Sequence, residues 1–307
     1  MSKKILFITG LSGFVGTNLH QFLGEEFDLR AITRIKSTNQ EEFNSFFKNY
    51  HSNSAFVHLA GKAHDLKLTS KPEDYYTVNT ELTKIIFDKF LKSQAKVFIT
   101  LSSVKAVADE LKSELTEECV PKPITHYGKS KLLAEEYILS KEIPEGKRIY
   151  ILRPCMIHGP GNKGNLNLLF KIVSKGIPWP LGKFENKRSF CSIDNLCFII
   201  KELLENENIP SGVYNIADDI PLSTKELINF ISLRQGKPAC IWNIPKYLIK
   251  FIARLGDFLY LPFNTERLFK LTETYIVSNN KIINAINKPL PISSKDGLMK
   301  TFKSFKI

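Results

Sequence analysis

A glycine-rich loop near the start of the chain limits the possible folds more than any other feature. Residues 4–9 are apolar enough for a strand, and they lead directly into Gly10, Gly13 and Gly16, which precede a helical pattern over residues 17–23. Glycines at such a junction allow a tight turn, close approach of the backbone to a ligand, and close packing of helix on strand. Because a helix N-terminus also offers free N–H groups and a positive dipole, we predict that a dinucleotide pyrophosphate binds here.

Short apolar runs alternate with helical patterns through the first two thirds of the chain. The strand candidates lie at residues 4–9, 29–33, 55–59, 96–102 and 148–152, with enough chain between them for crossover helices. This alternation predicts an α/β fold, a doubly wound parallel sheet with helices on both faces. With 307 residues, against roughly 150 for a typical domain, the chain has room for one large unit or two lobes.

The alternation loosens after Pro154. Residues 159–165 and 176–182 are rich in glycine and proline, which is typical of loops. A further strand at 189–193 and another at 212–216 are expected to return to the sheet. We therefore predict two units: a dinucleotide-binding domain of residues 1–155 with 189–216, and a smaller, C-terminal substrate-binding lobe of residues 156–188 with 217–307.

The end of the second predicted strand bears on the choice of dinucleotide. An acid at this position would hold the ribose 2′-hydroxyl of NAD, but the chain carries Thr33-Arg34-Ile35-Lys36. A guanidinium and an ammonium favour a 2′-phosphate, so we predict NADP(H), with NAD(H) as the alternative. Two ordinary surface cations are the other interpretation.

A tyrosine and a lysine spaced four residues apart form the second candidate motif. Tyr127 and Lys131 lie at the start of a helical pattern, and residues four apart share one face of a helix. A neighbouring ammonium favours the phenolate, so we expect Lys131 to lower the pKa of Tyr127 and make it a usable acid–base group. Ser102 and Ser103 end the fourth predicted strand, where a hydroxyl can orient a substrate oxygen. Alone, such a Tyr/Lys pair is more often a surface feature.

Together these motifs resemble the extended short-chain dehydrogenase/reductase family, also called the NAD-dependent epimerase/dehydratase family, and in particular its nucleotide-sugar 4-epimerases and 4-keto reductases. Further matches are His58-Leu59-Ala60-Gly61, Asn79, Arg153-Pro154 and Gly159-Pro160-Gly161. The resemblance covers essentially the whole chain and implies a Rossmann-type fold that binds NAD(P). It also implies that Tyr127 is the general acid/base, that Ser103 is its partner on the substrate oxygen, and that Lys131 also binds the nicotinamide ribose.

The predicted site residues fall into three groups. The catalytic group is Ser103, Tyr127 and Lys131. The cofactor-binding group is Gly10, Ser12, Gly13, Phe14, Val15, Gly16, Arg34, Leu59, Ala60, Gly61, Asn79, Ser102, Tyr127, Lys131 and Pro154. The group that would bind a UDP-sugar is Ser103, Lys105, Asn165, Arg188 and Arg267. Arg188 is chosen because a guanidinium binds phosphate oxygens bidentately, whereas Arg267 fits an ordinary surface arginine as well.

The residues after Ser103 reduce the number of reactions that the chain is expected to catalyse. In the 4,6-dehydratases that the chain resembles, an Asp-Glu pair follows this position, but the chain carries Val104 and Lys105, which disfavours dehydration. Segments around residues 102–105, 159–165 and 186–189 resemble a bacterial subgroup that includes 4-keto reductases. We therefore expect an NADPH-dependent 4-keto reductase of a UDP-linked 6-deoxy-HexNAc sugar in surface polysaccharide biosynthesis. The alternatives are a UDP-glucose or UDP-GlcNAc 4-epimerase with tightly bound NAD, and a non-catalytic NADP(H)-binding protein.

Composition limits the partners. The formal net charge is +12, but the basic residues are dispersed and form no nucleic-acid motif, so we expect no nucleic-acid role. Five scattered cysteines without a CxxC pair argue against disulfides and a zinc site, and no metal is predicted. His58 and Cys155 are expected to be packed structural residues. The N-terminus has too few apolar residues for a signal peptide, which predicts a cytoplasmic protein.

Residues 247–263 are the most apolar later stretch. Lys250, Arg254 and Asp257 interrupt them, so they predict an amphipathic helix rather than a transmembrane one. Because the segment is also basic, peripheral membrane association is an alternative role. The resemblance further suggests a homodimer, since relatives often pair through helices matching residues 79–91 and 131–139.

Overall fold

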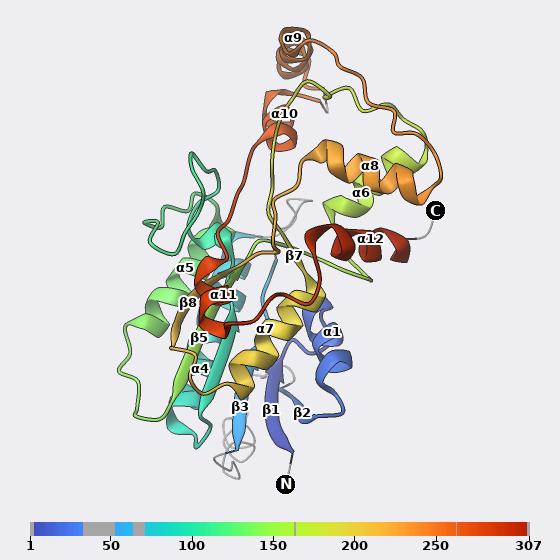
Figure 1. Cartoon of the computed structure of the whole chain (residues 1–307). Coiled ribbons are helices and arrows are strands. Elements are labelled where there is room, and N and C mark those ends of the chain that lie inside the picture. The colour runs from blue at the N-terminus through green and yellow to red at the C-terminus, as the bar shows by residue number, and fades with distance from the viewer. Residues whose placement is uncertain (1–2, 33–52, 64–70, 163, 262, 306–307) are drawn as a thin grey trace.

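A six-stranded parallel sheet forms the centre of the structure, a computed structural model that describes residues 3–32, 53–63, 71–162, 164–261 and 263–305 (Figure 1). The strands lie in the order β2 (Phe27–Ile32), β1 (Lys4–Thr9), β3 (Ser54–His58), β4 (Val97–Leu101), β5 (Arg148–Pro154) and β8 (Gly212–Ile216). Every neighbouring pair is parallel. The predicted doubly wound α/β fold is therefore confirmed, and β1 lies at the point where the chain reverses its direction across the sheet.

Alternate strand residues face two different helix layers. Phe7 and Phe56 point to one face, where they pack with α4 (Leu82–Lys92) and α5 (His126–Leu139). Leu6 and Ile8 point to the other, which is covered by α1 (Phe14–Leu23), α7 (Ile193–Glu205) and α11 (Asn280–Ile286) (Figure 1). Because successive strand side chains alternate, a sheet buried on both faces needs near-continuous apolar strands, as this sequence has.

The helix that leads into α4 is irregular. It begins as the short α3 (Pro72–Tyr75), passes through a π-helical turn, η1 (Tyr76–Glu81), and continues as α4. The extra residue of a π turn changes which side chains face the sheet, and it places Asn79 in the buried interior. A short 3₁₀ turn, η2 (Val104–Ala106), follows the end of β4.

The remaining elements pack around a second apolar core, which includes Phe170, Trp179, Leu227 and Phe302. They are β6 (Met156–His158), α6 (Asn165–Ser174), β7 (Phe190–Ser192), α8 (Thr224–Arg234), α9 (Lys246–Phe258), α10 (Thr265–Thr272) and α12 (Ser294–Ser304). The prediction that the strand at 189–193 returns to the main sheet is wrong: β7 pairs with β6 in a separate two-stranded sheet, whereas β8 does join the main sheet beside β5. The proposed lobe boundaries stay a prediction.

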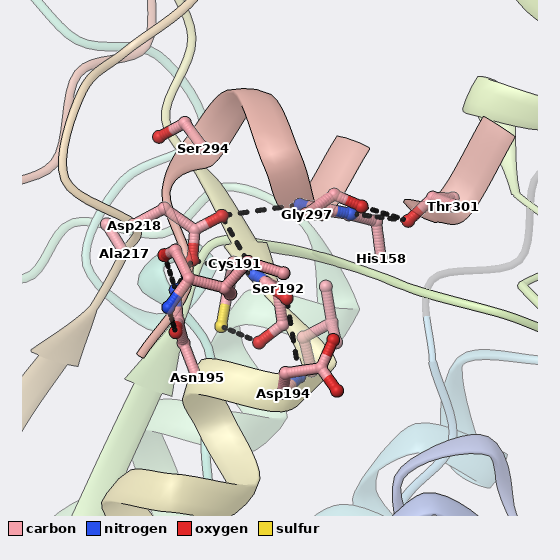
Figure 2. A network of polar contacts seen from close by, with 12 residues as sticks. His158, Cys191, Ser192, Asp194, Asn195, Ala217, Asp218, Ser294, Gly297 and Thr301 are labelled. Carbon is pink, nitrogen blue, oxygen red and sulfur yellow. Dashed lines mark hydrogen bonds and ion pairs between the residues drawn. The ribbon is translucent and has the colours of Figure 1, made fainter. Parts of the chain in front are cut away.

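A buried polar network joins the small sheet to α7 and α12 (Figure 2). The Asp218 carboxylate accepts hydrogen bonds from the backbone N–H of Ser192 at 2.9 Å and from Asn195 Nδ2 at 2.7 Å. The ring of His158 lies between Asp218 and Thr301, with nitrogen–oxygen distances of 3.3 and 2.9 Å. Because all these groups are buried, the network fixes how β6, β7, α7 and α12 meet.

Candidate active site

The glycine loop lies at the carboxyl end of β1 and leaves no room for a side chain at Gly10 or Gly16. Gly10 has a φ of +72°, and a Cβ there would lie 2.7 Å from the backbone nitrogen of Ala60. A Cβ on Gly16 would lie 2.3 Å from the carbonyl oxygen of Gly10. The glycines therefore bring α1 and the loop after β3 against the end of β1, as the spacing predicts.

A cavity of about 750 Å³ opens beside this loop. It contains three of the predicted cofactor residues, Gly10, Ser12 and Ala60. Sequence reasoning missed the other wall residues, which are Thr9, Leu11, Thr17, His20, Ala31, Ile32 and Leu82. Ala31 and Ile32 end β2 next to β1, so the register of the two strands is the signal that would have found them.

The remaining loop residues form the start of α1. Gly13 precedes the helix, and Phe14, Val15 and Gly16 make its first turn, whose N–H groups have no helical carbonyl to bind. These free N–H donors and the glycine loop lie at the end of β1, where the order of the strands across the sheet reverses. Such a place fits a dinucleotide pyrophosphate. Arg34, on which the choice of NADP(H) rests, lies outside the described residues.

The three predicted catalytic residues meet in a second cavity, of about 260 Å³. Ser103 lies two residues after the end of β4 and caps η2, and Tyr127 and Lys131 come from the first turns of α5, which begins after the Thr125 cap. Four predicted cofactor residues also line this cavity: Leu59, Gly61, Ser102 and Pro154. The other lining residues were not predicted, and they are Lys62, Ala63, Leu101, Cys155 and Ile157. The two cavities adjoin, because Ala60 lines the first while its neighbours Leu59 and Gly61 line the second.

The expected effect of Lys131 on Tyr127 is wrong in this structure. Burial raises the pKa of Tyr127 above its ordinary value, and the hydrogen bond with Ser103 opposes this only in part. Tyr75 packs edge-on against the Tyr127 ring, with centroids 6.2 Å apart, and adds to the enclosure. The phenol therefore holds its proton at neutral pH, and its close polar partner is Ser103 rather than the lysine.

Lys131 is buried and held by the backbone. Its Nζ donates a hydrogen bond of 2.8 Å to the carbonyl oxygen of Leu101. Burial lowers the pKa of Lys131 to about 8, although the negative charge of Glu135 raises it. The ammonium is thus charged at neutral pH but loses its proton only slightly above it.

Sequence reasoning missed the carboxylate that supports this lysine. Glu135 lies one helical turn after Lys131 and forms a buried ion pair with Arg153, with 2.5 Å between Arg153 Nη2 and Glu135 Oε2. The hydroxyl of Ser102 also donates to Glu135. The spacing of four residues from Lys131 is the sequence signal that points to Glu135.

Asn79, in the π turn η1, forms hydrogen bonds to two segments of the site. Its side-chain oxygen accepts from the backbone N–H of Lys62 at 2.8 Å, and its Nδ2 donates to Ser130 Oγ at 3.0 Å. It thereby ties the loop after β3 to α5, and it does not line either cavity. His58 is buried as expected, between the hydroxyls of Thr9 and Thr83, and burial lowers its pKa to about 3.

The candidates for substrate binding are spread more widely. Asn165 and Arg188 share a third, largely apolar cavity of about 220 Å³ with Trp179, Lys270 and Leu271. It adjoins the second cavity, because Met156 lines the third while Cys155 and Ile157 line the second.

Two of the three cations predicted to bind substrate already have partners. Arg188 contacts the Glu273 carboxylate at 3.0 Å and the carbonyl oxygens of Lys270 and Glu273. Lys105 lies 4.1 Å over the Tyr275 ring and donates to the carbonyl oxygen of Asp109. Arg267 is exposed on α10 and lines neither of the last two cavities.

Comparison with known proteins decides the family. The model of the NAD dependent epimerase/dehydratase family matches residues 6–217, more than two thirds of the chain. This protein belongs to that family. The UDP-glucose 4-epimerase of Vibrio cholerae is 28% identical over 99% of this chain and 96% of its own. The N-acetyl-alpha-D-glucosaminyl-diphospho-ditrans,octacis-undecaprenol 4-epimerase of Escherichia coli O157:H7 is 30% identical over 92% of this chain and 85% of its own.

The fold of the family is equally clear. RMD from Pseudomonas aeruginosa, solved in complex with NADPH, superposes with a TM-score of 0.73 at 21% identity, covering 98% of this chain and 99% of RMD. As a member of the epimerase/dehydratase family, the chain is an NAD(P)-dependent enzyme of the short-chain dehydrogenase/reductase type, as its motifs predict. The glycine cradle of this family member fits that cofactor.

Other kinds of site are not found in the described part of the chain. No cluster of three His, Cys, Asp or Glu side chains there could hold a metal ion. None of its helices has the length and apolar character needed to cross a bilayer. Burial raises the pKa of Cys155, so this thiol in the wall of the second cavity stays protonated, as expected of a packed residue.

Proposed function

We propose that this enzyme reduces the 4-keto group of a UDP-linked 6-deoxy-HexNAc sugar with NADPH. The observation that carries the proposal is the meeting of Ser103, Tyr127 and Lys131 in one cavity, next to the cavity of the glycine loop. The third cavity, with Asn165 and Arg188, adjoins it and would take the diphosphate and nucleoside of the substrate.

The protonation states suit a reduction. When bound, the reduced nicotinamide supplies the hydride that adds to C4 of the sugar. Tyr127 then gives its proton to the oxygen of the former carbonyl, and solvent returns a proton to the phenolate. The raised pKa of Tyr127 keeps that proton in place before the reaction, and the Ser103 hydroxyl holds the substrate oxygen beside it. The charged Lys131 lines the same cavity and would stabilise the negative charge that develops on the substrate oxygen.

The residues after Ser103 support redox chemistry at C4 without dehydration. Elimination of water requires a further acid and base, but Val104 is buried and apolar. Lys105 is directed to Tyr275 and the carbonyl of Asp109.

A 4-epimerase is the second candidate, favoured by the names of the two relatives described above. In such an enzyme the same three residues would take and return the proton of the C4 hydroxyl, and bound NAD would supply the hydride acceptor and donor, with no net use of the cofactor. In the Escherichia coli relative the sugar is carried by diphospho-undecaprenol, so a polyprenyl diphosphate carrier belongs in the test.

Turnover of a substrate panel separates these functions. The purified protein is incubated with NADPH or NADH and with UDP-hexoses, UDP-HexNAc sugars, their 4-keto-6-deoxy derivatives and polyprenyl-diphosphate GlcNAc, while nicotinamide absorbance and sugar products are followed. We expect consumption of NADPH only with a 4-keto-6-deoxy sugar. Interconversion of C4 epimers without NADPH consumption would instead establish the epimerase. Preference for NADH would contradict the cofactor assignment, and no turnover of any sugar would overturn both functions.

A further inference from the structure

The helix α9 exposes a broad apolar face. Its most exposed apolar side chains are Tyr247, Phe251 and Phe258, with 75%, 64% and 79% of their surfaces accessible. The same face contains Leu248, Ile252, Leu255 and Leu259, all at least 41% exposed. These residues recur at intervals of three and four, so they cover about 140° of the helix circumference. A continuous exposed apolar face of this kind is typical of an interaction surface.

This face is not the one by which α9 joins the protein. Ile249, Ala253 and Gly256 lie on the other side of the helix and are its buried residues. Gly256 is in close contact with the returning chain, since a Cβ there would lie 1.9 Å from the carbonyl oxygen of Phe263. The helix therefore has its own packing side, and the broad apolar face is additional to it.

The apolar surface continues past the end of the helix. Tyr260 turns the chain with a φ of +52° and is 96% exposed, and the neighbouring Leu261 is 47% exposed. Figure 1 shows α9 at the end of the molecule opposite the N-terminus, above α10. We call α9 together with residues 259–261 the α9 surface. Its position leaves the face open to a large, flat partner.

A row of positive charges borders the apolar face. Lys246, Lys250 and Arg254 are spaced four residues apart, so they form one edge of the helix between its apolar and buried sides. Within the described ranges, Lys250 and Arg254 form no ion pair. The two nearby acids are engaged elsewhere: Asp257 accepts from the backbone N–H of Thr265 at 3.1 Å, and Glu266 pairs with Lys270 at 2.5 Å. In the described part of the chain Lys246 lies 5.9 Å from the centre of the Phe184 ring, so Lys250 and Arg254 are the charges of this edge that are left to meet negative charge.

We propose that the α9 surface binds the headgroup region of an anionic lipid bilayer, with the helix lying parallel to the membrane. A wide apolar face bordered by lysine and arginine is the pattern of an interfacial helix. The 13 residues of α9 extend only about 20 Å, too short to cross a bilayer core of about 30 Å. A second copy of the chain fits less well, because antiparallel two-fold pairing through this face would place the two rows of positive charge on the same side of the contact. The proposal does not depend on which sugar the enzyme uses.

Docking in this way would also orient the active site. The helix α10 packs on α9 and contributes Lys270 and Leu271 to the wall of the third cavity. The α9 surface would therefore hold that cavity close to the lipid headgroups.

Vesicle flotation of the full chain tests the proposal directly. We expect the protein to float with phosphatidylethanolamine–phosphatidylglycerol vesicles, to float poorly with phosphatidylcholine vesicles, and to be released by high salt. Each basic side chain near an anionic surface contributes about fivefold to binding. A triple variant should therefore bind anionic vesicles at least about a hundredfold more weakly; its substitutions are Lys246→Glu, Lys250→Glu and Arg254→Glu. Phe251→Ser with Phe258→Ser should weaken it at least tenfold at any salt concentration.

Matched controls separate docking from folding and from net charge. Lys112→Glu, Lys122→Glu and Lys237→Glu combined reverse three exposed lysines elsewhere and change the net charge by a similar amount, so this variant should still bind well. Circular dichroism verifies that every variant is folded. Wild-type protein that fails to float with anionic vesicles overturns the proposal. So does a dimer in analytical ultracentrifugation that the Phe251/Phe258 variant dissociates, because the face would then belong to a second copy.

Discussion

The roles of two residues depend on surroundings that the sequence does not display. Tyr127 and Lys131 lie on one turn of α5, yet burial shifts each pKa toward the uncharged form. The phenol consequently begins as an acid, and the lysine stays charged because Glu135 partly offsets its burial.

Removing the phenolic hydroxyl should abolish most of the proton transfer. Tyr127→Phe is expected to lower kcat by about 10²–10⁴-fold, the usual contribution of a positioned acid, and to leave the dissociation constant of NADPH nearly unchanged. Steady-state kinetics and fluorescence titration of NADPH measure the two quantities. Tyr137→Phe on the same helix, whose hydroxyl instead binds Asp88, should retain full turnover. Full turnover by Tyr127→Phe would remove the residue from the mechanism.

The lowered pKa of Lys131 predicts a pH limit for the reaction. Because the charged lysine is the active form, kcat/KM should fall as the pH rises through about 8, the pKa in the folded protein. The unfolded chain binds more protons than the folded one between that pKa and the ordinary value of Lys131, so this group makes the folded state more stable as the pH rises across this interval. A pH series of initial rates and of denaturant unfolding measures both effects.

The Lys131→Arg variant provides the control for the pH series. A guanidinium stays charged throughout this range, so whatever activity the variant keeps should show no decrease near pH 8. A wild-type profile that stays flat well above that pH would contradict the assignment.

At the scale of elements, the site depends on how α5 is attached to the sheet. Glu135 on α5 and Arg153 on β5 form the buried pair, and Asn79 joins the π turn to the same helix. These contacts fix the rotation of α5, which in turn directs Tyr127 and Lys131 into the second cavity.

Breaking the buried Glu135–Arg153 pair should lower the free energy of unfolding far more than breaking a surface ion pair. Glu135→Ala leaves the Arg153 guanidinium buried and unpaired, so the free energy of unfolding is expected to fall by about 3–5 kcal/mol. Glu266→Ala, which removes the exposed pair with Lys270, should leave the free energy of unfolding almost unchanged. Urea unfolding of both variants measures the difference. Equal effects would show that the Glu135 pair does not hold α5 in place.

At the level of the whole molecule, the buried polar network of Figure 2 holds the two apolar cores in their relative position. Asp218 follows β8 of the main sheet, while its partners come from β6, β7 and α7. The second and third cavities meet at the same junction, along residues 155–157. The network therefore sets how the cavities are aligned.

Removing the central carboxylate should weaken this junction. Asp218→Ala deprives Ser192, Asn195 and His158 of a buried acceptor, and about 1–3 kcal/mol is expected for each group left unsatisfied. Calorimetry should show a much lower Tm, together with a higher KM for the sugar substrate. Asp28→Ala, at an exposed pair with Arg30, is the control and should leave Tm almost unchanged. An unaltered Tm in Asp218→Ala would mean that packing alone aligns the two cores.

The sequence determined the main sheet, the glycine loop and the identity of the three residues in the second cavity. These are local patterns: apolar runs define strands, glycine spacing defines the turn, and a spacing of four places Tyr127 and Lys131 on one helix face.

Only the tertiary structure decided the pairing of β7 with β6, the upward shift of the Tyr127 pKa and the partners of Arg188. Each of these depends on groups far apart in the chain. Glu273 lies 85 residues from Arg188, for example, and the Tyr75 ring that packs against Tyr127 comes from α3 rather than α5. Sequence spacing reports which side chains share an element, whereas charge, desolvation and strand pairing depend on which elements meet in space.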